Sequence, residues 1–191
     1  MSRDALYPVF LKLDGLPVVV VGGGPVAAGK LDGLLAAGAK VTVVAPQICE
    51  AIRTRDVTLI ESAFRPAHLA GARWVVAAAP PEVNRDVAVA AAARGLFVNA
   101  VDDTRAATAY LGGVLRRGEV EIAISTGGLA PALAGLLREA LDAVLPHDLD
   151  RWVEVATAAR EDWKKSKVPM TERRPLLLRA LDRIYKTEAH S

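Results

Sequence analysis

The sequence has little of what marks secreted, membrane or nucleic-acid-binding chains. Its 191 residues include one cysteine, Cys49, which excludes an internal disulfide and a cysteine-rich zinc site. Aromatic residues make up 5%, too few for the stacking platforms that bind single-stranded nucleic acid. The uncharged, mostly apolar stretch over residues 15–29 is broken by prolines and glycines and is too short to span a bilayer. With no charged-then-apolar leader in the sequence, we expect a cytoplasmic protein without membrane or nucleic-acid partners.

Apolar residues, by contrast, are abundant, and the charges are unevenly placed. Hydrophobic residues make up 52% and charged residues 24%, which excludes a disordered or collagen-like chain. Residues 151–191 carry ten Lys or Arg against six Asp or Glu, whereas residues 1–150 carry fourteen against sixteen. Such a basic tail is either a solvated helix face or a surface that meets an acidic ligand. The three histidines, His68, His147 and His190, are widely separated, so we expect no metal site.

The first hundred residues alternate between short β-branched runs and helical segments. Strands are predicted at residues 16–21, 40–44, 57–61, 74–79 and 96–101, and helices at 26–37 and 83–94, with a short helix or turn at 66–71. Continuous apolar strands are typical of a parallel sheet that is covered on both faces. The pattern therefore predicts an α/β fold with a doubly wound, Rossmann-type sheet.

The pattern changes after residue 102. Two strands are predicted at 108–115 and 119–124, followed by a helix over 131–144 and by charged helices that Pro169 and Pro175 interrupt. We therefore predict a dinucleotide-binding domain over residues 1–107, a small α/β segment over 108–147 and a helical C-terminal domain over 148–191.

A glycine loop separates the first strand from the first helix. It fits the pattern G-x-G-x-x-A and consists of Gly22, Gly23, Gly24, Pro25, Val26 and Ala27. The first glycine permits a tight turn, the second lets the backbone approach a pyrophosphate, and the alanine lets the helix pack near the sheet. The alternative, a purely structural glycine turn, is disfavoured because the loop lies inside a strand–helix–strand unit. The loop therefore predicts a dinucleotide cofactor bound at the helix N-terminus.

The end of the second strand bears on which dinucleotide is bound. An acidic residue usually binds the ribose hydroxyls there, whereas an arginine accommodates the 2′-phosphate of NADP. This chain has Pro46 and Gln47 at that place, and Gln47 offers an amide for the ribose. Arg53 and Arg55 lie near in sequence but not directly after the strand. We therefore predict NAD rather than NADP.

Two further groups of residues follow strands at the edge where ligands bind in open α/β sheets. Asp102 and Asp103 come after the fifth strand, where a carboxylate is either a proton acceptor or a turn cap. Ser125, Thr126, Gly127 and Gly128 precede the helix at Pro131, and this run is either an anion-binding nest or an ordinary N-cap turn.

These motifs together resemble the precorrin-2 dehydrogenase and sirohydrochlorin ferrochelatase family, the N-terminal type of sirohaem synthase. The resemblance spans residues 7–145 and includes the glycine loop, Glu82-Val-Asn84, Val98-Asn-Ala-Val-Asp102 and the run that ends at Gly128. It implies NAD-dependent oxidation of precorrin-2 to sirohydrochlorin, on the path to sirohaem or cobalamin. Some members also insert Fe²⁺ into sirohydrochlorin, a lyase activity, and members are homodimers through the segment after the Rossmann domain.

The resemblance also implies roles for single residues. Asp102 falls on the catalytic aspartate, and Ser125, Thr126, Gly127 and Gly128 fall on the substrate side. Precorrin-2 carries many carboxylates, so Arg105, Arg116, Arg117 and Arg138 are candidates to pair with them, Arg138 being equally a candidate for a helix-surface or dimer residue. Two other interpretations stay open, a non-catalytic NAD-sensing module and another small NAD oxidoreductase, because both share the glycine loop.

Overall fold

The structure, a computed structural model, describes residues 5–101 and 103–188 and falls into two compact units. The first unit comprises the chain up to Leu111 together with Gly127–Ala130, and the second comprises Gly112–Thr126 and the chain from Pro131 onward. The three-part domain division stays a prediction.

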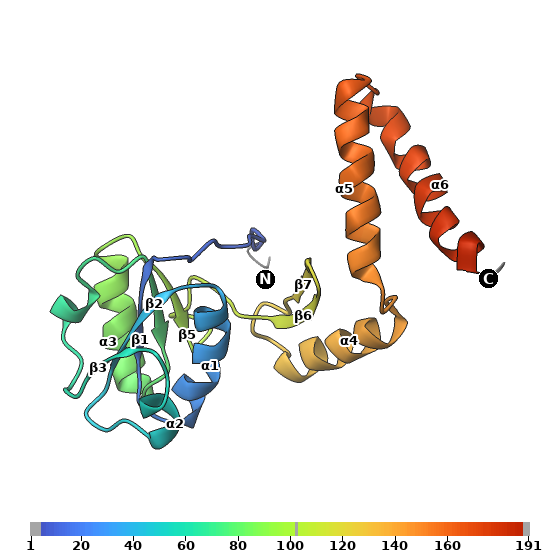
Figure 1. Cartoon of the computed structure of the whole chain (residues 1–191). Helices are drawn as coiled ribbons and strands as arrows, with labels where there is room; N and C mark the ends of the chain where they lie inside the picture. Colours follow the sequence, from blue (N-terminus) through green and yellow to red (C-terminus); the bar gives the residue numbers. More distant parts are fainter. Residues whose placement is uncertain (1–4, 102, 189–191) are drawn as a thin grey trace. The chain divides into compact units, whose positions relative to one another are not determined.

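A five-stranded parallel sheet forms the centre of the first unit (Figure 1). Its order is β3-β2-β1-β4-β5, which confirms the predicted Rossmann-type α/β fold. The strands are β1 (Pro17–Val21), β2 (Lys40–Val44), β3 (Thr58–Ile60), β4 (Trp74–Ala77) and β5 (Phe97–Ala100). All pairings are parallel, so the carboxyl ends of the five strands share one edge.

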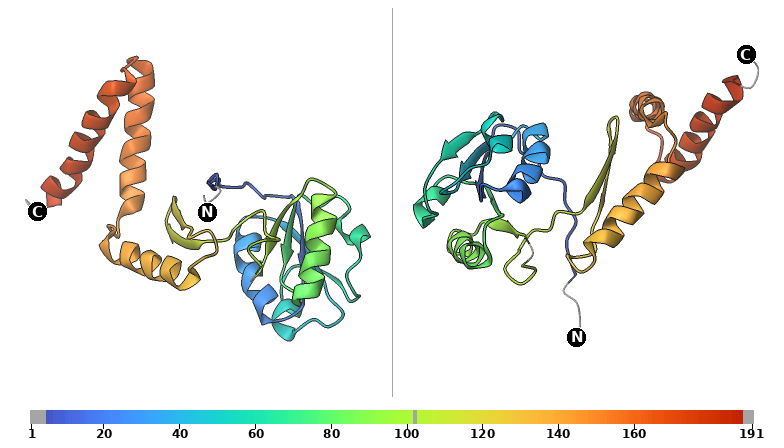
Figure 2. Two further views of the ribbon diagram at one scale, coloured as in Figure 1. Left: turned by 180° about the vertical axis from the view of Figure 1, so that it is seen from behind. Right: turned by 90° about the horizontal axis from the view of Figure 1, so that it is seen from below.

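Helices cover both faces of this sheet (Figure 2). They are α1 (Pro25–Ala36), α2 (Glu50–Arg53), α3 (Pro81–Ala92) and a 3-10 turn at Pro66–Leu69. Alternate residues of β1 point to opposite sides: Val18 packs in a cluster with Leu31 of α1, and Val19 in a second cluster with Val87 of α3. This two-sided burial explains why the strands are continuous apolar runs.

The second unit consists of an antiparallel hairpin and three helices (Figure 1). Its elements are β6 (Gly113–Arg117), β7 (Val120–Ile124), α4 (Pro131–Val144), α5 (Leu149–Lys165) and α6 (Met170–Glu188). α5 and α6 pack against each other, and Trp152 Nε1 donates a hydrogen bond of 2.6 Å to the hydroxyl oxygen of Tyr185. None of the helices in the described ranges is long and apolar enough to cross a membrane.

The short helix α2 was not predicted from the sequence, and two further features differ from the prediction by more than a shift of one or two residues. β6 begins at Gly113 rather than at residue 108, because the backbone amides of Thr108 and Ala109 both donate to the Val98 carbonyl, at 2.9 and 3.0 Å. Pro175 does not interrupt a helix but lies inside α6. It is the sixth residue of that helix, so its ring removes the hydrogen bond that would have ended on the Thr171 carbonyl, near the start of the helix.

Candidate functional site

Gly22 makes the turn that leads out of β1. Its φ is +134°, a region that side chains rarely adopt, and its amide donates to the Val44 carbonyl at 3.0 Å. A Cβ at this position would lie 2.2 Å from the Ala78 carbonyl oxygen, at the exit of β4. Glycine is therefore required here by the conformation and by the packing.

Gly23 packs against the loop that follows β2. Its carbonyl accepts a hydrogen bond of 2.8 Å from the Cys49 amide. A Cβ on Gly23 would lie 1.9 Å from the backbone oxygen of Gln47. This close approach fixes the loop that carries Pro46 and Gln47 beside the glycine loop, at the carboxyl edge of the sheet.

Gly24 and the start of α1 present an open backbone surface. A Cβ on Gly24 would meet no atom within 4 Å, and the next two residues, Pro25 and Val26, are exposed. The Ala28 amide donates to the Gly24 carbonyl and closes the first turn, so the amides before it lack acceptors within the helix. Ala27 is fully buried against the sheet. The arrangement fits a pyrophosphate, which needs close approach to backbone amides.

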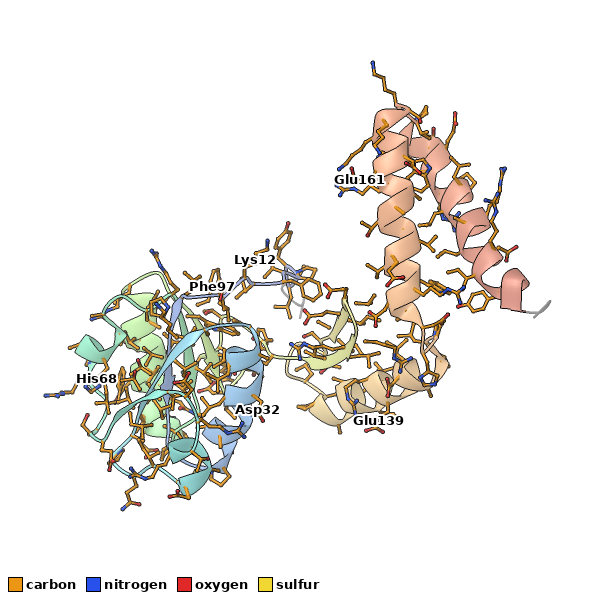
Figure 3. All side chains as sticks on the ribbon, viewed as in Figure 1. Lys12, Asp32, His68, Phe97, Glu139 and Glu161 are labelled. Carbon is orange, nitrogen blue, oxygen red and sulfur yellow. The ribbon has the colours of Figure 1, made fainter. Side chains whose placement is uncertain are left out.

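An ion pair borders the loop after β2. The guanidinium of Arg53 donates to the Ile48 carbonyl at 3.2 Å and to Glu61 Oε1 at 2.8 Å. The hydrogen bond with Arg53, and then its charge, lower the pKa of Glu61, and the same pair raises the pKa of Arg53. Arg55 pairs instead with Asp32, a residue of α1, at 2.6 Å (Figure 3).

Two buried amide side chains hold the exits of β4 and β5. Asn84, on α3 and 3% exposed, accepts from the Ala79 amide at 2.9 Å and donates to the Val101 carbonyl at 3.4 Å. Asn99, 7% exposed, donates to the Ala109 carbonyl at 3.0 Å. Sequence reasoning placed both asparagines in the family motifs but missed their positioning role. The signal for it was a polar residue at an otherwise apolar position of a helix or strand.

The predicted catalytic residue, Asp102, lies outside the described residues. Its neighbour Asp103 caps a turn, because its Oδ1 accepts from the amides of Arg105 and Ala106, both at 3.1 Å. The side chain of Arg105 is exposed on this turn. Of the two roles that the sequence allowed for Asp102 and Asp103, proton acceptor or turn cap, Asp103 has that of the turn cap.

The predicted Ser-Thr-Gly-Gly run is divided between the two units. Gly127 and Gly128 belong to the first, with φ values of +64° and +75°. A Cβ on Gly128 would lie 2.6 Å from the Thr104 methyl group, so this glycine packs on the turn that carries Arg105. Ser125 and Thr126 belong to the second unit, directly after β7.

Arg116 and Arg117 have partners within the second unit. Arg116 pairs with Glu121 across the hairpin at 2.6 Å. Arg117 is 15% exposed; it pairs with Asp142 and donates to the carbonyls of Leu145 and Pro146 at 2.6 and 3.0 Å. Arg117 therefore anchors the end of α4, whereas Arg116, like Arg105, is exposed.

Two grooves lie away from the glycine loop. One of about 620 Å³ is lined by residues that include Pro17, Lys40 and Thr58, at the amino ends of the strands. One of about 750 Å³ lies in the second unit and is lined by residues that include Gly118 and Asp150. Within residues 5–101 and 103–188 there is no group of three or more His, Cys, Asp or Glu side chains suited to a metal ion. The candidate site is the carboxyl edge of the sheet, where Gly24 and the start of α1 are open.

Comparisons with known proteins agree with this geometry. The chain is 41% identical over 177 residues to siroheme synthase 2 of Aeromonas hydrophila, a match that covers 91% of this chain and 37% of that protein. It is 38% identical to the siroheme synthase of Photorhabdus laumondii, over 87% of this chain and 37% of that protein. The chain thus spans less than half the length of these curated relatives. The resemblance seen in the motifs is confirmed.

A solved structure and a family model also match this chain. A solved structure described as SirC, precorrin-2 dehydrogenase, is similar in fold, with a TM-score of 0.67, 23% identity, and coverage of 91% of this chain and 88% of that one. The sequence model of a family described as putative NAD(P)-binding matches residues 9–113, more than half of the chain. The chain therefore belongs to this family of putative NAD(P)-binding proteins.

Proposed function

We propose that the chain is an NAD-dependent dehydrogenase that oxidises precorrin-2 to sirohydrochlorin in sirohaem or cobalamin synthesis. The observation that carries the proposal is the open glycine loop at the carboxyl edge of a β3-β2-β1-β4-β5 sheet, in a chain that aligns with siroheme synthases over 91% of its length. Ligands bind at this edge in open α/β sheets, and the loop is built for a pyrophosphate.

The cofactor residues are proposed to be those of the glycine loop and of the loop after β2. The amides at the start of α1 would hold the pyrophosphate, and Pro46 and Gln47 would border the ribose. Bound NAD⁺ supplies the hydride acceptor of the reaction. The task of the protein is then to hold substrate and cofactor in register and to take up the proton that leaves with the hydride.

The substrate side is proposed to include Arg105 and the Ser125–Gly128 run. Arg105 is exposed on the turn against which Gly128 packs, so its guanidinium is available to a carboxylate of the tetrapyrrole. Asp102 is the proposed proton acceptor, on the strength of the family resemblance and of its place directly after β5 and Val101. The Asn84 contact to the Val101 carbonyl would help to set where the chain leaves β5.

Insertion of Fe²⁺ into sirohydrochlorin is proposed as a second reaction of the same site. It removes two pyrrole protons, and the carboxylate of Asp102 is the proposed base. The siroheme named in the relatives is an iron complex, which supports testing this reaction. A rate of iron insertion no greater than in a blank without protein would reject this chelatase (lyase) activity.

We also propose that the chain is a cytoplasmic homodimer that binds neither nucleic acid nor membrane. Support for the dimer comes from α4, where Leu133, Leu136, Leu137 and Val144 form one apolar side and are 47, 61, 42 and 75% exposed. Light scattering should give twice the 20.2 kDa chain mass, and Leu137→Glu should shift it to the monomer. A monomer for the unaltered chain would overturn the dimer.

The dehydrogenase is tested by incubating the purified chain with precorrin-2 and NAD⁺. We expect NADH absorbance to rise together with the sirohydrochlorin spectrum. Asp102→Asn should bind NADH nearly as well as the unaltered chain but turn over roughly tenfold more slowly or worse, because a general base is lost. NAD binding without turnover would favour a sensing module, and unchanged turnover in Asp102→Asn would remove the proposed role of that residue.

A further inference from the structure

A carboxylate, that of Glu61, lies at the carboxyl edge of the sheet, but it follows β3 and not β2, the strand after which an acidic residue usually binds the ribose. No acidic residue follows β2 before Glu50, but Glu61 directly follows β3. β2 and β3 pair with Val44 opposite Ile60, and the Ala45 amide donates to the Ile60 carbonyl at 3.2 Å. Glu61 therefore lies beside the loop after β2, at the edge where a dinucleotide ribose is bound in this fold.

The Glu61 carboxylate forms an ion pair with Arg53, which lies at the same edge of the sheet. Arg53 ends α2, and its hydrogen bond to the Ile48 carbonyl holds the guanidinium against the loop after β2. Its Nη1 is 2.8 Å from Glu61 Oε1, and the two side chains are 38 and 51% exposed. The pair is thus open to solvent and within reach of a ligand, but the positive charge of Arg53 is already neutralised by the carboxylate of Glu61.

We propose that Glu61 is a specificity-determining residue that favours NAD over NADP by holding the guanidinium of Arg53. The inference rests on the proposed function. A 2′-phosphate is bound through charge-assisted hydrogen bonds from an arginine whose donors are available. Here Nη1 of Arg53 is bonded to Glu61 and Nε to the Ile48 carbonyl, and the Glu61 carboxylate would also repel the phosphate. The hydroxyl of NAD carries no charge and meets neither obstacle.

A second ion pair of the same kind provides a matched control. Arg55 lies two residues beyond Arg53 and pairs with Asp32 at 2.6 Å, with side chains 42 and 63% exposed. Asp32 lies seven residues beyond Pro25 in α1 (Figure 3), which places it about 10 Å along the helix axis from the glycine loop. Asp32→Asn therefore releases an arginine that is held toward α1 rather than toward the residue after β3.

The test compares NADH and NADPH binding to the full chain by fluorescence titration. For the unaltered chain we expect NADH to bind roughly tenfold more tightly than NADPH, or better. Glu61→Gln should strengthen NADPH binding about tenfold, since one charge-assisted hydrogen bond to the phosphate becomes possible, and should change NADH binding less than about threefold. Asp32→Asn should change neither affinity. Arg53→Gln added to Glu61→Gln should remove the improvement, with unfolding temperatures confirming that all variants are folded.

Three results would overturn the inference: an unchanged NADPH-to-NADH ratio in Glu61→Gln, an equal improvement in Asp32→Asn, or an improvement that persists without Arg53. Failure of the proposed function looks different. If NADH binds and the NADPH-to-NADH affinity ratio shifts in Glu61→Gln as expected, but precorrin-2 is not oxidised, the proposed dehydrogenase activity is rejected. The role of Glu61 in cofactor specificity is then retained. Binding of neither dinucleotide by the unaltered chain would overturn both.

Discussion

The parallel sheet and the C-terminal helices bury apolar side chains to very different extents. In the first unit the interior residues of β1 and β4 are 0–7% exposed, and helices cover both faces of the sheet. In the second unit, among the described residues, the buried apolar side chains are Leu115, Ala134, Leu149 and Ile184. The first unit thus closes its own core, whereas the second leaves the leucines of α4 exposed.

The two units consequently depend on different contacts. The glycine loop is held by backbone approaches that leave no room for a side chain, as at Gly22 and Gly23. The second unit relies on polar links between its elements, chiefly Arg117 at the end of α4 and Trp152 with Tyr185 between α5 and α6. Buried packing positions a cofactor rigidly, while a small core with polar links is typical of a segment completed by another surface.

The largest effect is expected from Gly22→Ala in the first unit. The added methyl group would meet the Ala78 carbonyl and would sit at a φ of +134°. We expect a loss of about 3 kcal/mol in the free energy of unfolding, since strain and overpacking add. Denaturant unfolding measures this. A loss below ~1 kcal/mol would mean that the turn out of β1 adapts to a side chain.

Gly24→Ala is the matched control for that substitution. Its φ of −94° suits alanine, and the methyl group meets no protein atom within 4 Å. Stability should therefore change by less than ~0.5 kcal/mol. NADH affinity should fall roughly tenfold or more, because the methyl group would occupy the approach of the pyrophosphate. Unchanged NADH affinity would place the pyrophosphate elsewhere.

A smaller effect is expected from Arg117→Leu in the second unit. The change leaves the carbonyls of Leu145 and Pro146 without this donor at the end of α4. We expect a loss of about 2 kcal/mol, with cleavage by protease appearing first around the hairpin and α4. Arg116→Ala, which removes only the exposed pair with Glu121, should be nearly neutral. Equal losses in both variants would contradict the anchoring role of Arg117.

The smallest effect is expected from Tyr185→Phe. It removes the hydroxyl that accepts from Trp152 Nε1 and donates to Asp148 Oδ1 at 3.3 Å, but both rings keep their edge-to-face contact, with centroids 6.3 Å apart. Because Tyr185 is 43% exposed, the indole can turn to water, and we expect a loss below ~1 kcal/mol. Thermal unfolding measures it. A larger loss would show that the packing of α5 on α6 depends on the hydrogen bonds of this hydroxyl.

Local patterns predicted the first unit well because each element there obeys its own rule. β-branched runs marked the five strands, and α1 and α3 end within three residues of Gly38 and Gly95, whose φ values are +75° and +64°. The start of β6 was misplaced because Thr108 and Ala109 are tied to Val98, a contact between distant segments. Pro175 was misjudged because its effect depends on its position within the helix, not on its presence alone.

The candidate site was predictable only in part. The glycine loop was visible because its residues are consecutive and lie between a strand and a helix. The Arg53–Glu61 pair joins two segments eight residues apart through side chains, and Asn84 reaches Val101 across seventeen residues. No local pattern encodes such contacts, since they depend on which strands become neighbours in the sheet.

Binding of the dinucleotide at the carboxyl edge of the sheet is tested most directly by amide hydrogen exchange with and without NADH. We predict slower exchange at the start of α1, from Gly24 to Ala28, and in the loop from Gln47 to Cys49, with little change in α5 and α6. Binding of NADH that leaves both loops unprotected, or that protects α5 and α6 instead, would contradict this placement of the cofactor.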